Sequence, residues 1–445
     1  MSFTPWVRRD LAVVATGRAA SVVGDEIALI TLLLWASARG HGPLAVAALV
    51  MAAALPQLLA APVAGLLADR VAARRLVATV SVLQAFACLA LVAAVATDVV
   101  ALVVACVVAL NLGQAVANPA WQALVPAIVP ESSLSRALAL LQTTSAAAAL
   151  VGPVIGGVLV GTLGTSVALL VDAGSFGALA LAALMLRADR RPEPGAARGK
   201  GEIWAGVRLV AAVPVLRGVM VLVISTVLVL GAVNVAEVFL ITQTLGASPV
   251  VYGLCGALFA VGLMAGAWAS RRELSVSTSA RALLVAMLEM AVAIALLGLS
   301  PTVAVAAIAS FFVGVGNGGL NVLAQSIIVR STPNDVLGRV FAVLQGGVGA
   351  GMLVATALGG ALLAMVDVRT VVTGSGLATA AVVLVAGRPL LRARSADDED
   401  LVGSGVAGGS TVVGTAGELR PGGDEGDPGS GARAVGVGGR GDRDG

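Results

Sequence analysis

Long apolar runs dominate this sequence and set the tightest limit on its fold. Stretches of about 20 mostly apolar residues recur as far as residue 390, and each is long enough to cross the hydrocarbon core of a bilayer as a helix. Of the 445 residues only 12% are charged, about half the fraction found in average globular chains. Too few charges remain to cover a soluble surface, so the sequence predicts an all-α protein that crosses a membrane many times.

Twelve such runs are present, and we expect each of them to form a membrane-spanning helix. Their approximate ranges are 12–37, 44–68, 76–96, 99–123, 138–161, 165–186, 218–241, 250–270, 282–299, 302–325, 341–364 and 370–390. With this alternation, 21 Arg and Lys residues fall in loops on the side of the N-terminus, and only Arg39 and Arg369 fall in loops on the other side. Because basic residues concentrate in cytoplasmic loops, we expect both termini in the cytoplasm and the protein in the plasma (inner) membrane.

A polar stripe occurs twice, at a constant offset of 203 residues. Amide side chains spaced by three, four and four residues share one face of a helix. The first copy consists of Asn111, Gln114, Asn118 and Gln122, and the second of Gly314, Asn317, Asn321 and Gln325. The match continues to Gly156-Gly157 and Gly359-Gly360. We interpret the chain as two related six-helix halves whose stripes face each other across a central cavity.

The two halves are separated by the longest and most basic internal loop. We expect a first bundle at 1–186, a cytoplasmic linker at 187–217 and a second bundle at 218–394. Within the linker, residues 203–213 can form an amphipathic helix on the membrane surface. Residues 395–445 are Gly-rich and polar without periodicity, which predicts a disordered cytoplasmic tail.

Span one carries charged side chains at membrane depth, where each charge costs roughly 2.5–3.5 kcal/mol on insertion scales. Arg18 and Asp25 are seven residues apart and share a helical face, whereas Glu26 is turned about 100° away, toward span five or seven. We therefore expect these residues to line a cavity or to pair. We assign Asp25 as a proton or cation site, Arg18 as its tuning partner and Glu26 as a further coupling residue. A static buried ion pair is the alternative.

Acidic residues also occur in later spans. Glu237, near the end of span seven, can couple protons or attract a cationic substrate, and it can equally be a rim residue in water. Asn234 precedes it by one turn and is added to the expected cavity lining. Asp172 in span six and Glu289 in span nine can snorkel or hold a proton, and neither is assigned a role.

Several classes of enzyme are excluded by missing residues. The single Lys200 is followed by Gly201, so the chain has no ATP-binding loop of the Gly-Lys-Ser/Thr type. The single His41 lies in an outer loop, which excludes a Ser/His intramembrane protease, and Asp25 lacks the Gly-x-Gly-Asp element of aspartyl intramembrane proteases. The three cysteines have neither metal nor disulfide spacing. We expect no enzymatic activity, no metal and no cofactor.

The loop between spans two and three contains a charged motif. It reads Gly65-Leu66-Leu67-Ala68-Asp69-Arg70-Val71-Ala72-Ala73-Arg74-Arg75. This resembles the signature loop of the major facilitator superfamily, although Ala72 and Ala73 stand where the family has Gly and a basic residue. The resemblance implies a gating contact with the start of span eleven, where helix-end N–H groups favour an anion. The implied gating residues are Gly65, Asp69, Arg70, Arg74 and Arg339; the alternative is a loop that only sets the topology.

Span five contains the sequence Gly152-Pro153-Val154-Ile155-Gly156-Gly157. It is similar to the Gly-Pro-x-x-Gly-Gly element of exporters in this superfamily, which implies a gating role for Gly152, Pro153, Gly156 and Gly157. Proline frees a backbone carbonyl and glycine permits tight helix packing, so a purely structural kink is the alternative. The stretches 118–157 and 18–34 also resemble the exporter branch that includes enterobactin and macrolide efflux proteins.

These resemblances imply a secondary transporter with twelve transmembrane helices in two pseudo-symmetric six-helix bundles that rock about a central cavity. The implied function is export of a small amphipathic drug or secondary metabolite in exchange for protons. A membrane potential of 100 mV supplies about 2.3 kcal/mol per charge, more than a tenfold concentration ratio. A metabolite facilitator or importer, or a non-transporting membrane receptor on the same scaffold, remains an alternative.

The expected partners are a small-molecule substrate, protons and the lipid bilayer, with no nucleic acid, and a monomer is expected. Candidate aromatic contacts for the substrate are Trp35, Trp121, Tyr252, Phe259 and Trp268, although such residues more often anchor a helix at the interface.

Overall fold

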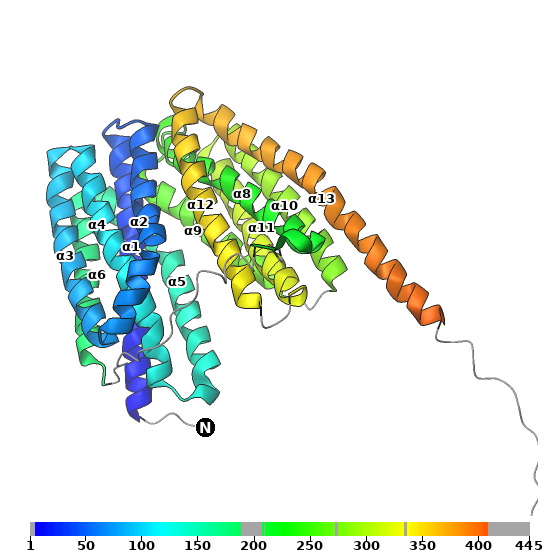
Figure 1. Cartoon of the computed structure of the whole chain (residues 1–445). Coiled ribbons are helices and arrows are strands. Elements are labelled where there is room, and N and C mark those ends of the chain that lie inside the picture. Colours follow the sequence, from blue (N-terminus) through cyan, green and yellow to red (C-terminus); the bar gives the residue numbers. More distant parts are fainter. Residues whose placement is uncertain (1–4, 188–206, 209, 272–274, 333–335, 408–445) are drawn as a thin grey trace, which may run out of the picture. The chain divides into compact units, whose positions relative to one another are not determined.

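The computed structural model describes residues 5–187, 207–208, 210–271, 275–332 and 336–407 (Figure 1). The chain divides into two compact units, residues 1–396 and 397–445, and every contact given below lies within the first. The elements are α1 (Pro5–Ala38), α2 (Pro43–Arg70), α3 (Ala73–Thr97), α4 (Val100–Ile128), α5 (Glu131–Leu163), α6 (Thr165–Met185), α8 (Pro214–Phe239), η1 (Leu240–Thr244), α9 (Pro249–Ala269), α10 (Val276–Leu299), α11 (Val303–Arg330), α12 (Leu337–Leu363) and α13 (Val368–Ala407).

Twelve helices within the described ranges are long and apolar enough to cross a membrane, which confirms the predicted number of spans and the all-α fold class. Their ends differ from the predicted ones, because α1 already begins at Pro5 and α13 continues to Ala407. Residues 395–407 are therefore helical where the sequence predicted an irregular tail. Residues 408–445 and, within the predicted surface helix, residues 203–206 and 209 lie outside the described residues, whereas residues 207, 208 and 210–212 are helical. The limits of the domains stay predictions.

The helices begin and end at residues that favour such positions. Pro43, Pro214 and Pro249 each occupy a first-turn position, where the missing N–H group costs nothing. At the start of α10, the Ser275 side chain accepts a hydrogen bond from the backbone N–H of Thr278, which satisfies one otherwise unpaired donor. The chain turns between α5 and α6 at Gly164, whose φ of 86° favours glycine. Local sequence signals therefore set the ends of these helices.

Helices α1 to α6 form one half of the fold and helices α8 to α13 form the other (Figure 1). In the first half, α1 packs against α5 and α6, α3 packs against α4 and α6, and α2 packs against α4. In the second half, α8 packs against α12, and α11 packs against both α9 and α10. The pairs α2–α4 and α9–α11 occupy corresponding places in the two halves, as the repeated sequence predicts.

Helices α9 and α11 approach each other closely through four glycines. Gly262 and Gly266 of α9 face α11, while Gly314 and Gly318 of α11 face α9. An ideal Cβ atom built on any of the four would overlap a backbone carbonyl oxygen of the opposite helix. Only a residue without a side chain fits at these positions, and such close approach is a common source of helix association in membranes.

This contact explains the single break in the repeated stripe. Asn111 of α4 corresponds to Gly314 of α11. The first half has room for a side chain at this position, whereas in the second half the α9 backbone fills the corresponding space. The Gln57 side chain of α2 donates a hydrogen bond to Asn111 Oδ1 over 3.3 Å. At this position of the stripe an amide hydrogen bond joins α2 to α4, whereas backbone atoms of α9 and α11 meet at the corresponding position.

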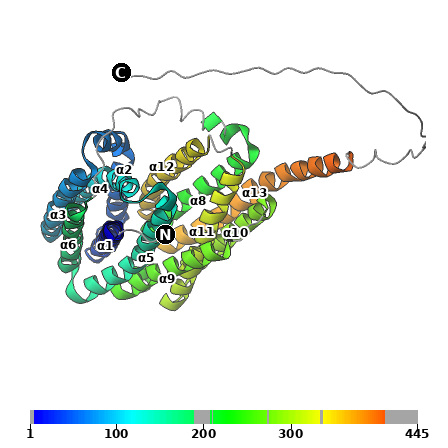
Figure 2. The same ribbon diagram turned by 90° about the horizontal axis from the view of Figure 1, so that it is seen from below.

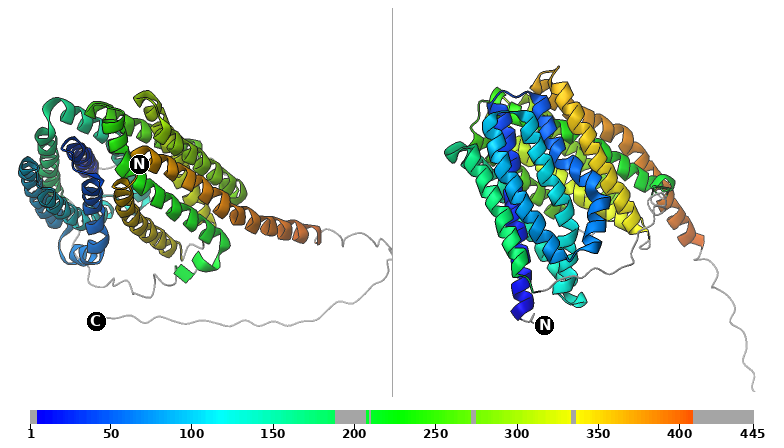
Figure 3. Two further views of the ribbon diagram at one scale, coloured as in Figure 1. Left: turned by 90° about the horizontal axis from the view of Figure 1, so that it is seen from above. Right: turned by 60° about the vertical axis from the view of Figure 1, so that its left-hand side comes forward.

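The two halves meet where α5 packs against α9 and where α2 packs against α12 (Figure 2). An ideal Cβ on Gly157 of α5 would lie 3.1 Å from the Cα of Gly253 in α9. Its repeat counterpart, Gly360 of α12, faces Ala47 of α2, whose Cβ would be 2.5 Å away. In the right-hand view of Figure 3 the yellow α12 runs beside the blue α2. Equivalent residues of the two copies thus build both contacts.

Hydrogen bonds join the halves at the end of the helices that carries residues 39–42, which we call the loop-1 end. Ser37 Oγ of α1 and Thr242 Oγ1 of η1 lie 2.8 Å apart, and Gln243 Nε2 donates to the carbonyl oxygen of Ser37 over 3.1 Å. Ser37 and Thr242 are 205 residues apart, close to the repeat offset, so they are near-equivalent positions. A contact between equivalent residues lies near the axis that relates the two halves.

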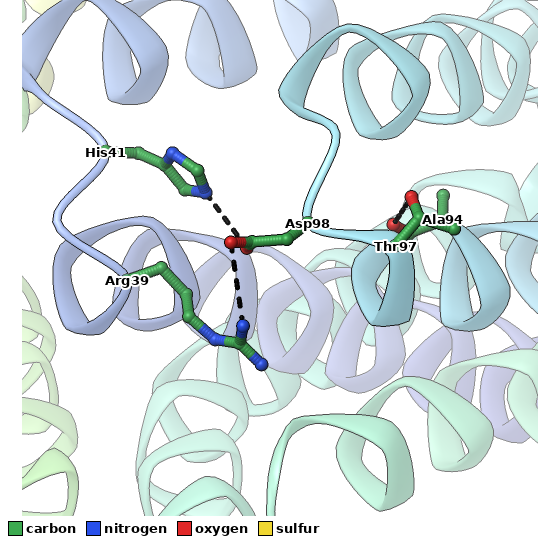
Figure 4. A network of polar contacts seen from close by, with 5 residues as sticks. All are labelled: Arg39, His41, Ala94, Thr97 and Asp98. Atoms are coloured by element: carbon green, nitrogen blue, oxygen red, sulfur yellow. Dashed lines mark hydrogen bonds and ion pairs between the residues drawn. The ribbon is translucent and has the colours of Figure 1, made fainter.

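A polar cluster on the same end ties two loops of the first half together (Figure 4). Asp98, between α3 and α4, adopts a left-handed backbone conformation with φ of 60°. Its carboxylate lies 3.1 Å from His41 Nε2 and 3.6 Å from Arg39 Nη1. Both partners belong to the α1–α2 loop, so the predicted loop position of His41 is confirmed.

Replacing Gly318 with leucine should destabilise the protein, because the new side chain meets backbone atoms that cannot rotate away. Overpacking of a buried site costs about 1–3 kcal/mol. The matched control is Gly174→Leu in α6, since an added Cβ there meets nothing within 4 Å. Thermal unfolding of both variants in detergent should show a lower Tm for Gly318→Leu only. Equal Tm values would contradict the described α9–α11 contact.

Ser37→Cys combined with Thr242→Cys should allow a disulfide bond between the halves. The native hydroxyl oxygens are 2.8 Å apart, which brings the two Cβ atoms near the separation of about 3.5–4.5 Å that a disulfide needs. With a protease site inserted between Arg187 and Val207, the cleaved halves should stay joined on a non-reducing gel. The single variants, which retain the three native free cysteines, should separate. Separation of the oxidised double variant would show that the halves do not meet here.

Candidate functional site

The charged residues of α1 are held by the polar stripe of α4. Arg18 Nη1 donates a hydrogen bond to Asn118 Oδ1 over 2.9 Å, and Gln114 Nε2 donates to Asp25 Oδ2 over 2.7 Å. Charged donors or acceptors make such bonds stronger than neutral pairs. The helices α1 and α4 run in opposite directions. The face of α1 that carries Arg18 and Asp25 therefore meets the amide face of α4, and the two hydrogen bonds follow one another along the helices like rungs of a ladder.

Arg18 and Asp25 form no direct salt bridge in the described part of the chain. They interact electrostatically at longer range, and each is bound to a neutral amide. The alternative of a static ion pair between them is therefore not seen among the described residues, where the α4 amides bind the two charged groups instead. The roles of Arg18 and Asp25 in coupling stay predictions.

The two stripes do not bond to each other in the described residues. Asn111 contacts α2 and the next two amides contact α1, so the stripe of α4 makes its hydrogen bonds within its own half. In α11, Asn321 Nδ2 donates to Asn317 Oδ1 over 2.7 Å, and Asn321 and Gln325 are exposed. The Gln122 side chain lies outside the described residues. That these residues line one central cavity stays a prediction.

A second buried carboxylate lies beside Asp25. Asp172 of α6 is only 1% exposed and accepts hydrogen bonds from Cys88 Sγ and Ser175 Oγ, each over 3.3 Å. Gly24 lets α6 approach α1 here, because an ideal Cβ on Gly24 would overlap Asp172 Oδ1. Sequence reasoning noticed Asp172 as an acidic residue in an apolar span and did not connect it to Asp25. Only the packing of α1 against α6 makes that connection.

The Gly-Pro-x-x-Gly-Gly motif of α5 lies between α1 and the other half of the molecule. An ideal Cβ on Gly152 would overlap the Cβ of Glu26, so Glu26 faces α5, one of its two predicted neighbours. Gly156 packs against the backbone of Ile27. Gly157 packs against Gly253 of α9. The motif therefore connects the charged segment of α1 to a contact between the halves.

Acidic residues of the second half lie near α11. Ser310 Oγ of α11 donates to Glu237 Oε1 over 3.4 Å, and Glu237 is half-buried. Asn234 is exposed. The carboxylate oxygens of Glu289 are buried and have no hydrogen-bond partner in the described ranges, and Glu289 packs against Gly316 of α11. Glu237 is thus positioned by a hydroxyl group.

The predicted gating loop is only partly described. Helix α2 continues through Arg70. The surroundings of Gly65 and the side chains of Asp69 and Arg70 lie outside the described residues. The Arg74 guanidinium donates to the carbonyl oxygen of Leu184 at the end of α6, in the same half. Arg339 lies in the first turn of α12 and is half-buried. The gating contact itself stays a prediction.

Comparison with known proteins agrees with this architecture. A family model described as Major Facilitator Superfamily matches residues 14–288 and 241–413. An uncharacterized MFS-type transporter, YfiS of Bacillus subtilis (strain 168), is 24% identical over 376 residues, covering 81% of this chain and 88% of that protein.

Similar solved structures are also transporters. A bacterial homologue of the iron transporter ferroportin in an inward-facing state is 16% identical with a TM-score of 0.66, covering 86% of this chain and 98% of that chain. A bacterial homolog of the human lysosomal transporter Spinster, inward-facing and unoccupied, is 12% identical with a TM-score of 0.63, covering 88% and 99%. At these identities the likeness concerns the fold alone. From its matched family model and its twelve helices in two related halves, the chain belongs to the major facilitator superfamily and is a multi-pass membrane transporter.

Proposed function

We propose that this transporter exports a small amphipathic molecule, a drug or secondary metabolite, in exchange for protons by alternating access. The observation that carries the proposal is the ladder of Arg18–Asn118 and Asp25–Gln114 hydrogen bonds at membrane depth. Ionisable residues inside a membrane are expensive and commonly mark proton or substrate pathways.

Charge balance in the first half supports proton or cation binding. Asp25, Glu26 and Asp172 supply three carboxyl groups around the single guanidinium of Arg18, and Asp25 interacts electrostatically with all three other residues. Uncompensated charges at this depth are costly. Binding and release of a proton at Asp25 would therefore change the energy of the site by an amount that can drive a conformational change.

The motif in α5 supplies a mechanical connection for such coupling. Gly152 contacts Glu26 next to Asp25, and Gly157 contacts Gly253 in the second half. A rearrangement of the charged segment of α1 would shift α5 and with it the contact between the halves. Because backbone meets backbone at Gly157 and Gly253, even a small shift of α5 is transmitted there rather than absorbed by flexible side chains.

The hydrogen bonds at the loop-1 end support an inward-facing state. We place both termini in the cytoplasm and the protein, as a monomer, in the plasma membrane, so that the loop-1 end faces outward. The Ser37–Thr242 contact would then close the outer end. The gating residues Asp69 and Arg339 would meet in the alternate, outward-facing state, where they would latch the inner end.

Replacing Asp25 with asparagine should reduce proton-driven transport at least tenfold, because the amide cannot release a proton at this position. The measurement is dye or drug movement in vesicles containing the purified chain, with an imposed pH gradient. Asp98→Asn in the exposed loop cluster is the matched control and should transport normally. Unchanged transport by Asp25→Asn would remove Asp25 from the mechanism.

The same vesicles separate the alternative functions. Wild-type movement that follows the substrate gradient and ignores the pH gradient would indicate a facilitator and contradict proton exchange. A folded chain that moves none of the tested dyes or drugs under either gradient would favour the non-transporting receptor.

A further inference from the structure

A pocket with a volume of about 210 Å³ lies between α1, α4 and α5, beside Arg18. Its polar lining consists of Arg18, Trp121, Gln142 and Ser145, and Val and Leu side chains such as Val14 and Leu138 complete it. The pocket holds far more space than the roughly 10–15 Å³ that a single water molecule needs. It is therefore large enough for a small organic molecule or for the head of a longer one.

The charged group at this pocket, the Arg18 guanidinium, is a hydrogen-bond donor only. A guanidinium carries five N–H groups and no acceptor, and in the described residues Arg18 bonds to Asn118 and forms no salt bridge. The Trp121 side chain is 3% exposed, and its indole N–H, which can only donate, has no partner in the same part of the chain. The five N–H groups of Arg18 exceed its one bond to Asn118, so Arg18 can bind a further acceptor in the pocket, whereas the indole nitrogen is covered by protein atoms and does not open into it.

The negative charge of Asp25 lies on the other side of Arg18. Along α4, Gln114 binds Asp25, Asn118 binds Arg18, and Trp121 follows at the pocket. Along α1, the pocket residue Val14 precedes Arg18, whereas Asp25 follows it by seven residues, about 10 Å along the helix. The cationic side chain therefore separates the pocket from the nearby carboxylate, which leaves the pocket suited to an anion.

We propose that this pocket binds the carboxylate group of a small amphipathic organic acid, with its apolar part against the Val and Leu side chains. Arg18 would hold the carboxylate through charge-assisted hydrogen bonds, and the Ser145 hydroxyl in the lining would donate a further bond. The inference deepens the proposed function by naming a class of substrate. It rests on that function only for the step from binding to transport.

The test is equilibrium binding of benzoate to the purified full-length chain in detergent, followed by calorimetry, with benzamide as the uncharged analogue. Wild-type protein should bind benzoate saturably and benzamide at least tenfold more weakly. Arg18→Gln should weaken benzoate binding about tenfold or more, since a hydrogen bond to a charged group is lost. Ser145→Ala removes only the hydroxyl donor and should weaken binding about two- to tenfold.

Matched controls are Arg39→Gln and Ser166→Ala, which change an exposed arginine and an exposed serine outside the pocket. Both should bind benzoate as the wild type does. The proposal is overturned if benzoate shows no saturable binding at millimolar concentration, if benzamide binds equally well, or if Arg18→Gln binds like the wild type. If Arg18→Gln does not fold, Ser145→Ala decides in its place, and wild-type affinity in that variant would overturn the site.

This experiment needs no membrane gradient, so its failure is distinct from a failure of proton exchange. Benzoate binding that depends on Arg18, together with vesicles that show no effect of a pH gradient, would leave the anion site standing and remove proton exchange. Proton-driven transport in vesicles together with absent benzoate binding would do the reverse.

Discussion

Within a bilayer, an apolar side chain gains little by leaving lipid for the surface of another helix. Helices that associate there depend on close backbone approach and on hydrogen bonds between polar side chains. Both kinds of contact are present here, and they are distributed unequally. Gly314 and Gly318 bring the backbones of α11 and α9 together, whereas Asn111, Gln114 and Asn118 connect α4 to α2 and α1 through their side chains.

The two halves therefore use one inherited framework in different ways. In the second half, glycine replaces the first amide of the stripe. The backbones of α9 and α11 then touch, and this contact leaves no room for side-chain rearrangement. In the first half, the retained amides hold Arg18 and Asp25 in place. Asp172 is added from α6 by a close approach at Gly24. Chemistry is concentrated in the first half, and backbone packing is concentrated in the second.

Much of this architecture could be predicted from the sequence, because the length of an apolar run and the spacing of polar residues are local properties. They gave the number of spans, the repeat, and the shared face of Arg18 and Asp25. The proximity of Asp172 could not be predicted, since it depends on how α6 packs against α1. The orientation of the stripes was only partly predictable for the same reason. An amide-bearing face needs polar partners. The sequence does not tell whether those partners are side chains of α1 and α2, as observed, or the polar contents of a cavity.

The contacts between the halves have the form of an isologous interface, in which patch A of one copy meets patch B of the other and the reverse. Gly157 faces Gly253, its counterpart Gly360 faces Ala47, and Ser37 meets Thr242. Six-helix copies begin and end on the same side, so fusing two of them end to end keeps both in one orientation. An ancestral single-copy protein with this surface could thus have paired with itself as a homodimer. Gene fusion would then have freed each copy to diverge without losing its partner.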